Sequence, residues 1–313
     1  MSGIPNRKVF TETLLSLAKE DQRIIALSSD SMGSATLDKF AAELPEQFVE
    51  VGIAEQNLVG IAAGMATCGK ITFPCSPACF LSTRSADQVK VDVAYSNNNV
   101  KLIGISGGVS YGALGSTHHS LQDIALMRTI PGLTVIIPAD NVETEQITKY
   151  LVGHDGPVYL RLGRGAAADV HDEDFVPEIG KGCTLLQGDD LTIVATGEVV
   201  RAALDAGMLL QTQGIYARVI EIHTIKPLDK EILMKAAEET GRIITVEEHS
   251  IYGGLGGAVA ELLAKTRPTP LKIMGIPDEP AVIGSQQEIF AYYGLNAQGI
   301  VAACYDLMEK FQK

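Results

Sequence analysis

The chain has 313 residues, enough for two domains that each bury a core. Its formal net charge of −13 argues against nucleic acid or an anionic membrane surface as a partner. No cationic segment precedes an apolar run at the N-terminus, and no apolar stretch reaches about 20 residues, so we expect a cytosolic protein. The cysteines form no CxxC pair, which favours reduced structural thiols over a metal site.

The first predicted elements are an amphipathic helix at 7–20 and a buried strand at 23–27. A loop of serines and Asp30 follows the strand. Ligands of open α/β sheets gather beyond the carboxyl ends of the strands, so this loop is a candidate pocket wall. On the residues alone, Arg7 is better interpreted as a solvated charge and Ser34 as a turn residue.

Residues 49–67 contain Glu55, the acidic residue that says most about function. The segment begins with a β-like run, turns at Gly52 and continues as an apolar series with helical spacing. Glu55 lies near the helix start, with only Gln56 and Asn57 as polar neighbours. Small residues along the helix would let another helix approach closely, as in a subunit interface. A poorly solvated acid at this position can donate to, or share a proton with, a ring nitrogen.

A strand at 70–80 then brings Phe80 to a strand exit, where it is equally well interpreted as a core residue. The buried strand 100–106 leads into a glycine-rich loop with adjacent histidines, His118 and His119. A lone histidine in a loop is usually structural, whereas this pair at a strand end is a better site candidate. The remaining predicted elements before residue 165 are helices 83–96, 123–128 and 141–152 and strands 133–137 and 158–162.

Residues 165–178 are small and acidic and have no clear period. We interpret 166–180 as a linker between domains at 1–165 and 181–313, and we expect its acids to be solvated rather than to bind a metal. Beyond it, strands are predicted at 191–195, 217–222 and 242–246 and a helix at 199–213. The alternation of strands and helices predicts mostly parallel sheets flanked by helices, an α/β fold.

Four motifs occur in a fixed order along the chain: GIAEQN at 52–57, TRSADQ at 83–88, GSTHHSLQDIALMRTIPGLTVIIPAD at 115–140 and VEEHSIYGGLG at 246–256. Together they resemble the pyrimidine-binding and C-terminal domains of transketolases, nearly from end to end. The resemblance implies two α/β domains and dependence on thiamine diphosphate. By it, Glu55 binds the aminopyrimidine and drives the tautomer that deprotonates the thiazolium carbon. His118 faces that carbon and the donor hydroxyl.

The resemblance also implies further cofactor contacts. Asp30 matches a family aspartate near the cofactor. Phe80 matches the aromatic that stacks on the aminopyrimidine, although Ala78 or Leu81 could align instead. Arg84 belongs to the family's TR-DQ pattern, which is expected to line a contact between subunits and the cofactor.

The resemblance also implies contacts with the substrate. Arg7, Ser34 and Arg164 match the residues that hold the sugar's terminal phosphate, with Arg161 as the alternative to Arg164. Two positions depart from the family pattern, since Leu114 replaces an aspartate and Ser106 replaces a histidine. A pocket that loses such polar partners should discriminate differently among hydroxylated sugars, so we expect an altered ketose specificity.

The family motif Gly-Asp-Gly, which leads the Mg²⁺ and diphosphate site, does not occur in the sequence. We therefore expect half of a split enzyme. A separate N-terminal transketolase subunit would hold the diphosphate and Mg²⁺, in an expected α2β2 heterotetramer, while this chain itself has no metal ligands.

The predicted activity is transfer of a two-carbon ketol unit from a ketose phosphate to an aldose phosphate. The alternatives are a deoxyxylulose-phosphate-synthase-like subunit, a 2-oxoacid dehydrogenase β subunit and a non-catalytic paralogue.

Overall fold

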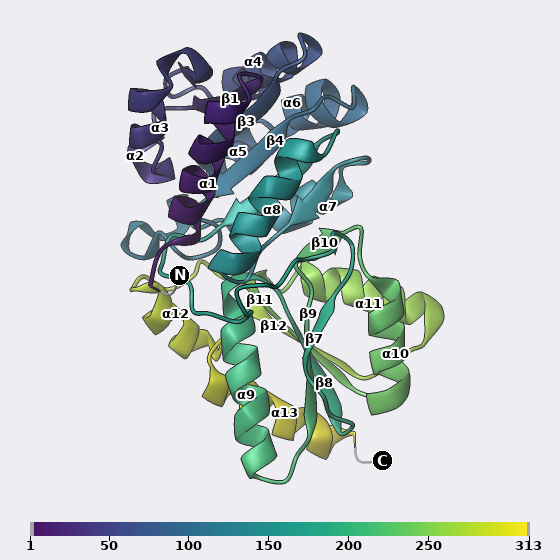
Figure 1. The fold of residues 1–313 in the computed structure, drawn as a ribbon. Coiled ribbons are helices and arrows are strands. Elements are labelled where there is room, and N and C mark those ends of the chain that lie inside the picture. Colours follow the sequence, from purple (N-terminus) through teal and green to yellow (C-terminus); the bar gives the residue numbers. More distant parts are fainter. Residues whose placement is uncertain (1–2, 312–313) are drawn as a thin grey trace.

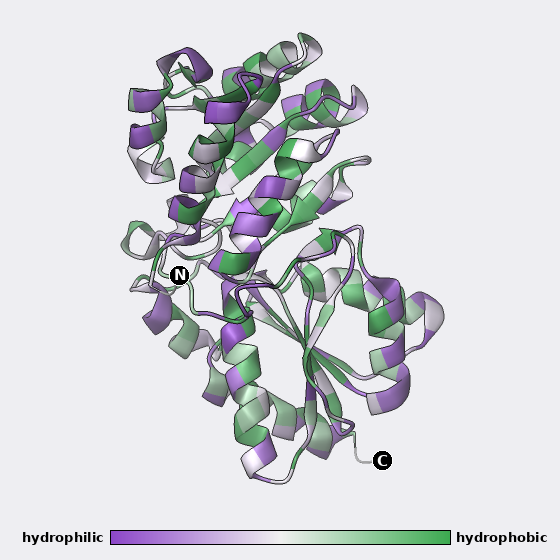
Figure 2. Ribbon diagram, in the orientation of Figure 1, coloured by the Kyte–Doolittle hydropathy of each residue, from purple (hydrophilic) through white to green (hydrophobic). Residues whose placement is uncertain are grey.

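The first sheet has seven strands in the order β10-β5-β6-β4-β3-β1-β2, and all but β10 run parallel (Figure 1). The computed structural model describes residues 3–311. The inner strands are runs of apolar residues because both of their faces are covered by helices (Figure 2). The strands are β1 (Ile24–Ser28), β2 (Phe48–Glu50), β3 (Ile71–Pro77), β4 (Lys101–Ile105), β5 (Thr134–Ile136), β6 (Val158–Leu162) and β10 (Thr224–Lys226).

Helices cover both faces of this sheet. On one face, Phe10 of α1 and Ile147 of α8 share a core with the strands, and on the other Leu58 of α4 packs with Met127 of α7. The helices are α1 (Asn6–Glu20), α2 (Met32–Ala35), α3 (Asp38–Glu43), η1 (Pro45–Gln47), α4 (Glu55–Thr67), α5 (Ala78–Arg84), α6 (Ala86–Gln88), η2 (Val89–Tyr95), η3 (Gly112–Thr117), α7 (Asp123–Thr129) and α8 (Asn141–Gly153). None of the helices within 3–311 is long and apolar enough to span a membrane.

The second sheet has five strands in the order β12-β11-β8-β9-β7, with only β7 antiparallel. Its strands are β7 (Cys183–Leu186), β8 (Leu191–Ala195), β9 (Ala217–Glu221), β11 (Ile243–Ser250) and β12 (Leu271–Ile276). Its helices are η4 (Gly197–Val199), α9 (Val200–Thr212), α10 (Lys230–Thr240), α11 (Leu255–Thr266), α12 (Gln286–Tyr293) and α13 (Ala297–Lys310). The predicted α/β architecture, with mostly parallel sheets between helices, is confirmed.

One strand connects the two sheets. β10 follows β9 of the second sheet but pairs with β5 of the first, where Thr224 lies opposite Ile136. One buried apolar cluster also runs without a break from Leu58 in α4 to Leu255 in α11. The two domains therefore share a core as well as a sheet edge.

Two predicted boundaries were wrong. The strand predicted at 70–80 ends at Pro77, so Phe80 lies on α5 rather than at a strand exit. The single helix predicted at 83–96 is divided at Ser85, whose hydroxyl donates to the Leu81 carbonyl at 2.5 Å. Serine hydroxyls that bond the backbone in this way compete with the helical ladder, and apolar spacing does not reveal the competition.

The glycine-rich start of α11 has an internal partner. The Glu247 carboxylate accepts the backbone N–H groups of Leu255 and Gly256 at 2.7 and 2.8 Å. Glu247 is fully buried, and its carboxylate lies so close to Gly254 that a side chain at position 254 would collide with it. A side chain of this chain therefore takes the place that a phosphate could occupy at a helix start.

We expect Glu247→Ala to lower the free energy of unfolding by about 2–4 kcal/mol, because two buried N–H donors lose their acceptor. Urea denaturation of the full chain measures this change. Ser285→Ala, which removes the exposed N-cap of α12, is the comparison and should cost about 1 kcal/mol. Equal costs for the two variants would contradict the assigned role of Glu247.

Candidate active site

The carboxyl ends of the parallel strands meet at one edge of the first sheet, and the candidate residues follow these ends. This is the edge at which open α/β sheets bind ligands. Asp30 follows β1, Glu55 follows β2, Phe80 and Arg84 follow β3, Ser106, Leu114 and His118 follow β4, and Arg164 follows β6.

Glu55 is the first residue of α4 and is only 3 % exposed. Its Oε1 accepts from Nη1 of Arg84, the last residue of α5, at 2.8 Å. The expectation that only Gln56 and Asn57 accompany this acid was wrong, because both are exposed while an arginine from another helix pairs with it. The ion pair fixes the carboxylate at the sheet edge.

Phe80 connects this ion pair to the candidate histidine. The Arg84 guanidinium carbon lies 4.0 Å from the centre of the Phe80 ring. The His118 ring meets Phe80 edge-on, with the ring centres 5.2 Å apart. Ala78 and Leu81, the alternative alignments, are fully buried. An acid and an aromatic ring on neighbouring helices suit a flat nitrogen heterocycle.

Tyr111 also belongs to the site, although the sequence did not predict it. Its ring lies 5.2 Å from the His118 ring in an edge-to-face contact, and the Arg164 guanidinium carbon lies 5.0 Å from its centre. The Thr117 hydroxyl and His118 Nδ1 are 2.9 Å apart. His118 is thus held between Phe80 and Tyr111. An aromatic residue within a glycine-rich loop was the available signal.

Two arginines lie near each other beyond Tyr111. Burial, together with the nearby charge of Arg164, lowers the pKa of Arg7. Arg7 Nη1 donates to the Ser34 backbone oxygen at 2.5 Å, so Ser34 contributes its carbonyl to this contact. Within 3–311, Nε of Arg7 and Nη1 of Arg164 are buried without a hydrogen-bond partner. Neighbouring cations with unpaired donors are suited to an anionic ligand.

Arg161, the alternative to Arg164, has a different position. It is buried, with Nε 3.2 Å from the Asp123 carboxylate and Nη2 donating to the Glu248 backbone oxygen at 2.7 Å. These contacts are within the fold, so Arg161 is not available to a ligand.

Three predicted residues contribute to the walls of this edge. Asp30 is exposed and has a φ of 52°, and its N–H donates to Glu50 at 2.7 Å. Ser106 is buried, also with a positive φ, and its hydroxyl has no hydrogen-bond partner in the described chain. Leu114 lies on η3, which was expected to be an irregular loop, and is 53 % exposed.

The loop that carries Tyr111 and His118 rests on the second domain. Val109 donates its N–H to Glu248 Oε1 at 2.9 Å, and a side chain on Gly108 would collide with that carboxylate. Gln286 donates to both Glu248 and Glu198 at 2.9 Å. Burial, partly offset by the charge of Arg161, raises the pKa of Glu248 to about 8.

Family models match both halves of the chain. Residues 2–169 match the pyrimidine-binding domain of transketolase, and residues 180–300 match the transketolase C-terminal domain.

Curated relatives and a solved structure match nearly the full length. A subunit of the apulose-4-phosphate transketolase of Phocaeicola vulgatus is 55 % identical over 97 % of this chain and 97 % of its own. The 6-deoxy-6-sulfo-D-fructose transketolase subunit SqwH of a Clostridium species is 40 % identical over 97 % of this chain and 94 % of its own. A structure described as a split gene transketolase, inactive beta4 tetramer, is 38 % identical and superimposes with a TM-score of 0.88, covering 98 % of this chain and 99 % of that one.

We expect stability to fall as the pH rises from about 5 to 8, because folded Glu248 keeps a proton that it releases on unfolding. In Glu248→Gln the group stays neutral in both states, so the decline should be shallower. Thermal unfolding midpoints at a series of pH values test this. The exposed Glu309→Gln variant should keep the wild-type slope, and parallel slopes for all three proteins would contradict the assignment.

Proposed function

The chain belongs to the transketolase family and matches the C-terminal subunits of split transketolases nearly end to end, and from this we propose how it works. It transfers a two-carbon ketol unit from a ketose donor to an aldose phosphate, jointly with a separate N-terminal subunit. The observation that carries the proposal is the continuous contact from Glu55 through Arg84 and Phe80 to His118.

Thiamine diphosphate, when bound, supplies the electron sink for breaking the carbon–carbon bond. The residues of this chain fit its aminopyrimidine, since a buried carboxylate lies beside an aromatic ring. Phe80 would supply an aromatic surface for the heterocycle, beside the Arg84 guanidinium that lies over its ring. Glu55 would hold and exchange a proton with a ring nitrogen. His118 would exchange a proton with the donor hydroxyl or stabilise charge on its oxygen.

Arg7 and Arg164 would bind the anionic end of the donor. Their mutual repulsion and unpaired N–H groups support this role. The names of two relatives point to the same chemistry, since one substrate is a phosphate and the other a sulfonated sugar. Each substrate has an anionic group, so we propose a ketose with such an end for this chain.

Leu114 and Ser106 would set the choice among such ketoses. The exposed Leu114 on η3 offers no hydrogen bond to a sugar hydroxyl, and the side chain of Ser106 is short and buried. The donor would therefore be selected by shape on this side of the pocket.

The partner chain would hold the diphosphate and Mg²⁺ and complete the site from outside. The start of α4 presents an exposed Ile53, 74 % accessible, with Gln56 and Asn57 beside it. A large exposed apolar side chain two residues before the buried acid suits a subunit contact. The inactive β4 tetramer of the split-gene relative supports the need for another subunit, and an α2β2 assembly would provide it.

We expect Glu55→Gln to lower kcat at least about 100-fold in the complex with the N-terminal subunit, because the amide cannot exchange the proton. Glu20→Gln, an exposed acid at the end of α1, is the matched control. Ketol transfer is measured with thiamine diphosphate and Mg²⁺, and gel filtration verifies that both variants still form the complex.

Unchanged turnover in Glu55→Gln would refute the assigned role. Turnover by the isolated chain would refute the split site. Activity with pyruvate instead of a ketose phosphate would favour the deoxyxylulose-phosphate-synthase or 2-oxoacid dehydrogenase alternatives, and a complex inactive with every donor would favour a non-catalytic paralogue.

We expect Arg164→Leu to raise KM at least about tenfold for phosphorylated donors and to change kcat much less, because a charge-assisted contact is lost from binding. Comparing each donor with its unphosphorylated form isolates the effect. Arg267→Leu, a half-exposed arginine in the second domain, should leave both constants unchanged. An equal loss for both donor forms would contradict the proposed anion site.

A further inference from the structure

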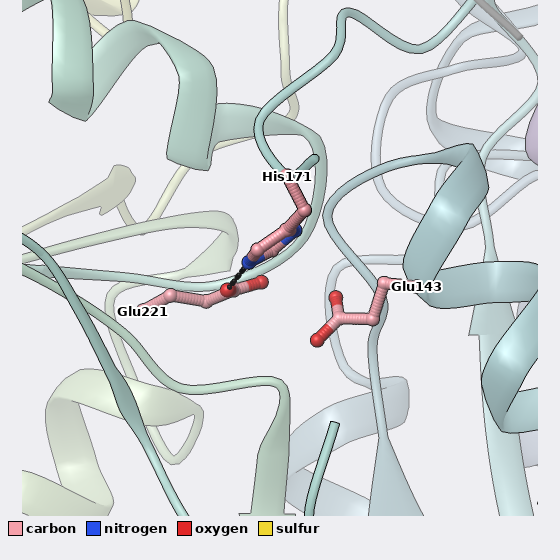
Figure 3. Close-up of side chains that lie close together, drawn as sticks. All are labelled: Glu143, His171 and Glu221. Carbon is pink, nitrogen blue, oxygen red and sulfur yellow. Dashed lines mark ion pairs between the residues drawn. The ribbon is translucent and has the colours of Figure 1, made fainter. Parts of the chain in front are cut away.

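A second cluster of polar side chains lies away from the sheet edge, where the segment between the domains meets both sheets. Glu143 comes from α8, His171 from the connecting segment and Glu221 from the end of β9 (Figure 3). Ligand atoms of all three lie within 4.8 Å of one another. The acids of the segment are exposed as predicted, whereas its histidine points inward and is 3 % exposed.

The two carboxylates of this cluster are buried, and some of their oxygens lack a hydrogen-bond donor. Glu143 and Glu221 are both 0 % exposed, and within 3–311 neither Glu143 Oε1 nor Glu221 Oε1 makes a hydrogen bond, while Glu221 Oε2 is paired with the His171 ring. Figure 3 shows the two carboxylates directed toward the same space beside the His171 ring. Two buried acids that face each other require a proton or a cation between them.

His171 is oriented as metal-binding histidines are. Its Nε2 faces Glu221 Oε2 at 2.8 Å, and its Nδ1 lies 3.3 Å from Asp140 Oδ2. Asp140 is itself held by the N–H groups of Glu143, Val170 and His171. A carboxylate behind the ring nitrogen fixes the tautomer that presents the other nitrogen to a metal.

Further donors lie around the cluster. Nε2 of the buried His223 is 3.9 Å from Glu143 Oε1, and the Thr224 hydroxyl orients its Nδ1 at 2.7 Å. The Cys183 thiol interacts with His171, and Cys183 lies opposite Glu221 in the β7–β9 pair. Nitrogen and carboxylate donors in a closed site favour Zn²⁺ or a related transition metal.

We propose that Glu143, His171 and Glu221, with His223 as a fourth donor, bind a divalent transition metal of the zinc class between the two domains. Two carboxylates balance the charge of such an ion, and two imidazoles complete a tetrahedral set. Donor atoms around Zn²⁺ are about 3.4 Å apart, so small side-chain movements would close Glu143, His171 and Glu221 around an ion, whereas His223 lies outside this set and would have to move further. This inference does not depend on the proposed function, since none of these residues belongs to the transketolase site.

A proton is the competing occupant. Burial alone would lower the pKa of His171, but contacts with Asp140, Cys183 and Glu221 raise it to about 12. Metal binding would therefore displace a proton from the ring.

The test uses the full-length chain, treated with a chelator and dialysed, and then titrated with Zn²⁺ against a chromophoric indicator. We expect tight binding of one equivalent per chain and a rise of several degrees in the unfolding midpoint, because the ion binds only the folded state. Co²⁺ should give the visible absorption of a tetrahedral nitrogen–oxygen site. His171→Gln should lose all three responses, whereas His154→Gln, a histidine outside the cluster, should keep them.

The titration of the wild-type chain tests zinc binding even if His171→Gln does not fold, and Glu221→Gln provides a second variant. No stoichiometric uptake by the wild-type chain would overturn the proposal and leave a proton as the occupant. An equal response to Zn²⁺ in a folded His171→Gln or Glu221→Gln variant would also overturn it.

Discussion

The ion pair between Glu55 and Arg84 is the contact on which the candidate site depends. It joins the first residue of one helix to the last residue of another, across a separation of 2.8 Å. Arg84 in turn lies over Phe80, and the ring contacts continue through His118 and Tyr111. A single buried acid thus sets the position of side chains from three strand ends. Such mutual support keeps a site preorganised before any ligand arrives.

The sequence predicted the elements well where the signal was local. Apolar runs marked the inner strands, and the rule for parallel sheets placed the loop that carries Asp30 at the carboxyl ends of the strands. The pairing of Glu55 with Arg84 could not be predicted from spacing, because these residues are 29 positions apart and meet only through tertiary packing. The break at Ser85 within the helix predicted at 83–96 was missed because a serine hydroxyl that bonds the backbone, and not apolar spacing, marks where the helices divide.

The connecting segment 166–180 was also predicted only in part from the sequence. Its composition is that of a solvated linker, and its acids are indeed exposed. His171 differs because Asp140 accepts N–H groups of the segment itself and draws it against both domains. The second domain also contributes to the site of the first, because Glu248 accepts a backbone N–H of the loop that carries His118. Residues that build the first domain's site are therefore held from outside that domain.

β10 has a consequence for how this chain can associate with others. By pairing with β5 it covers one border of the first sheet, and the opposite border is β2, a strand of only three residues. Unpaired backbone groups on a long outer strand invite aggregation or sheet extension, and this arrangement leaves little of either border open. The first domain is therefore suited to associate through side chains on its helix surfaces, which can specify one partner where bare backbone cannot.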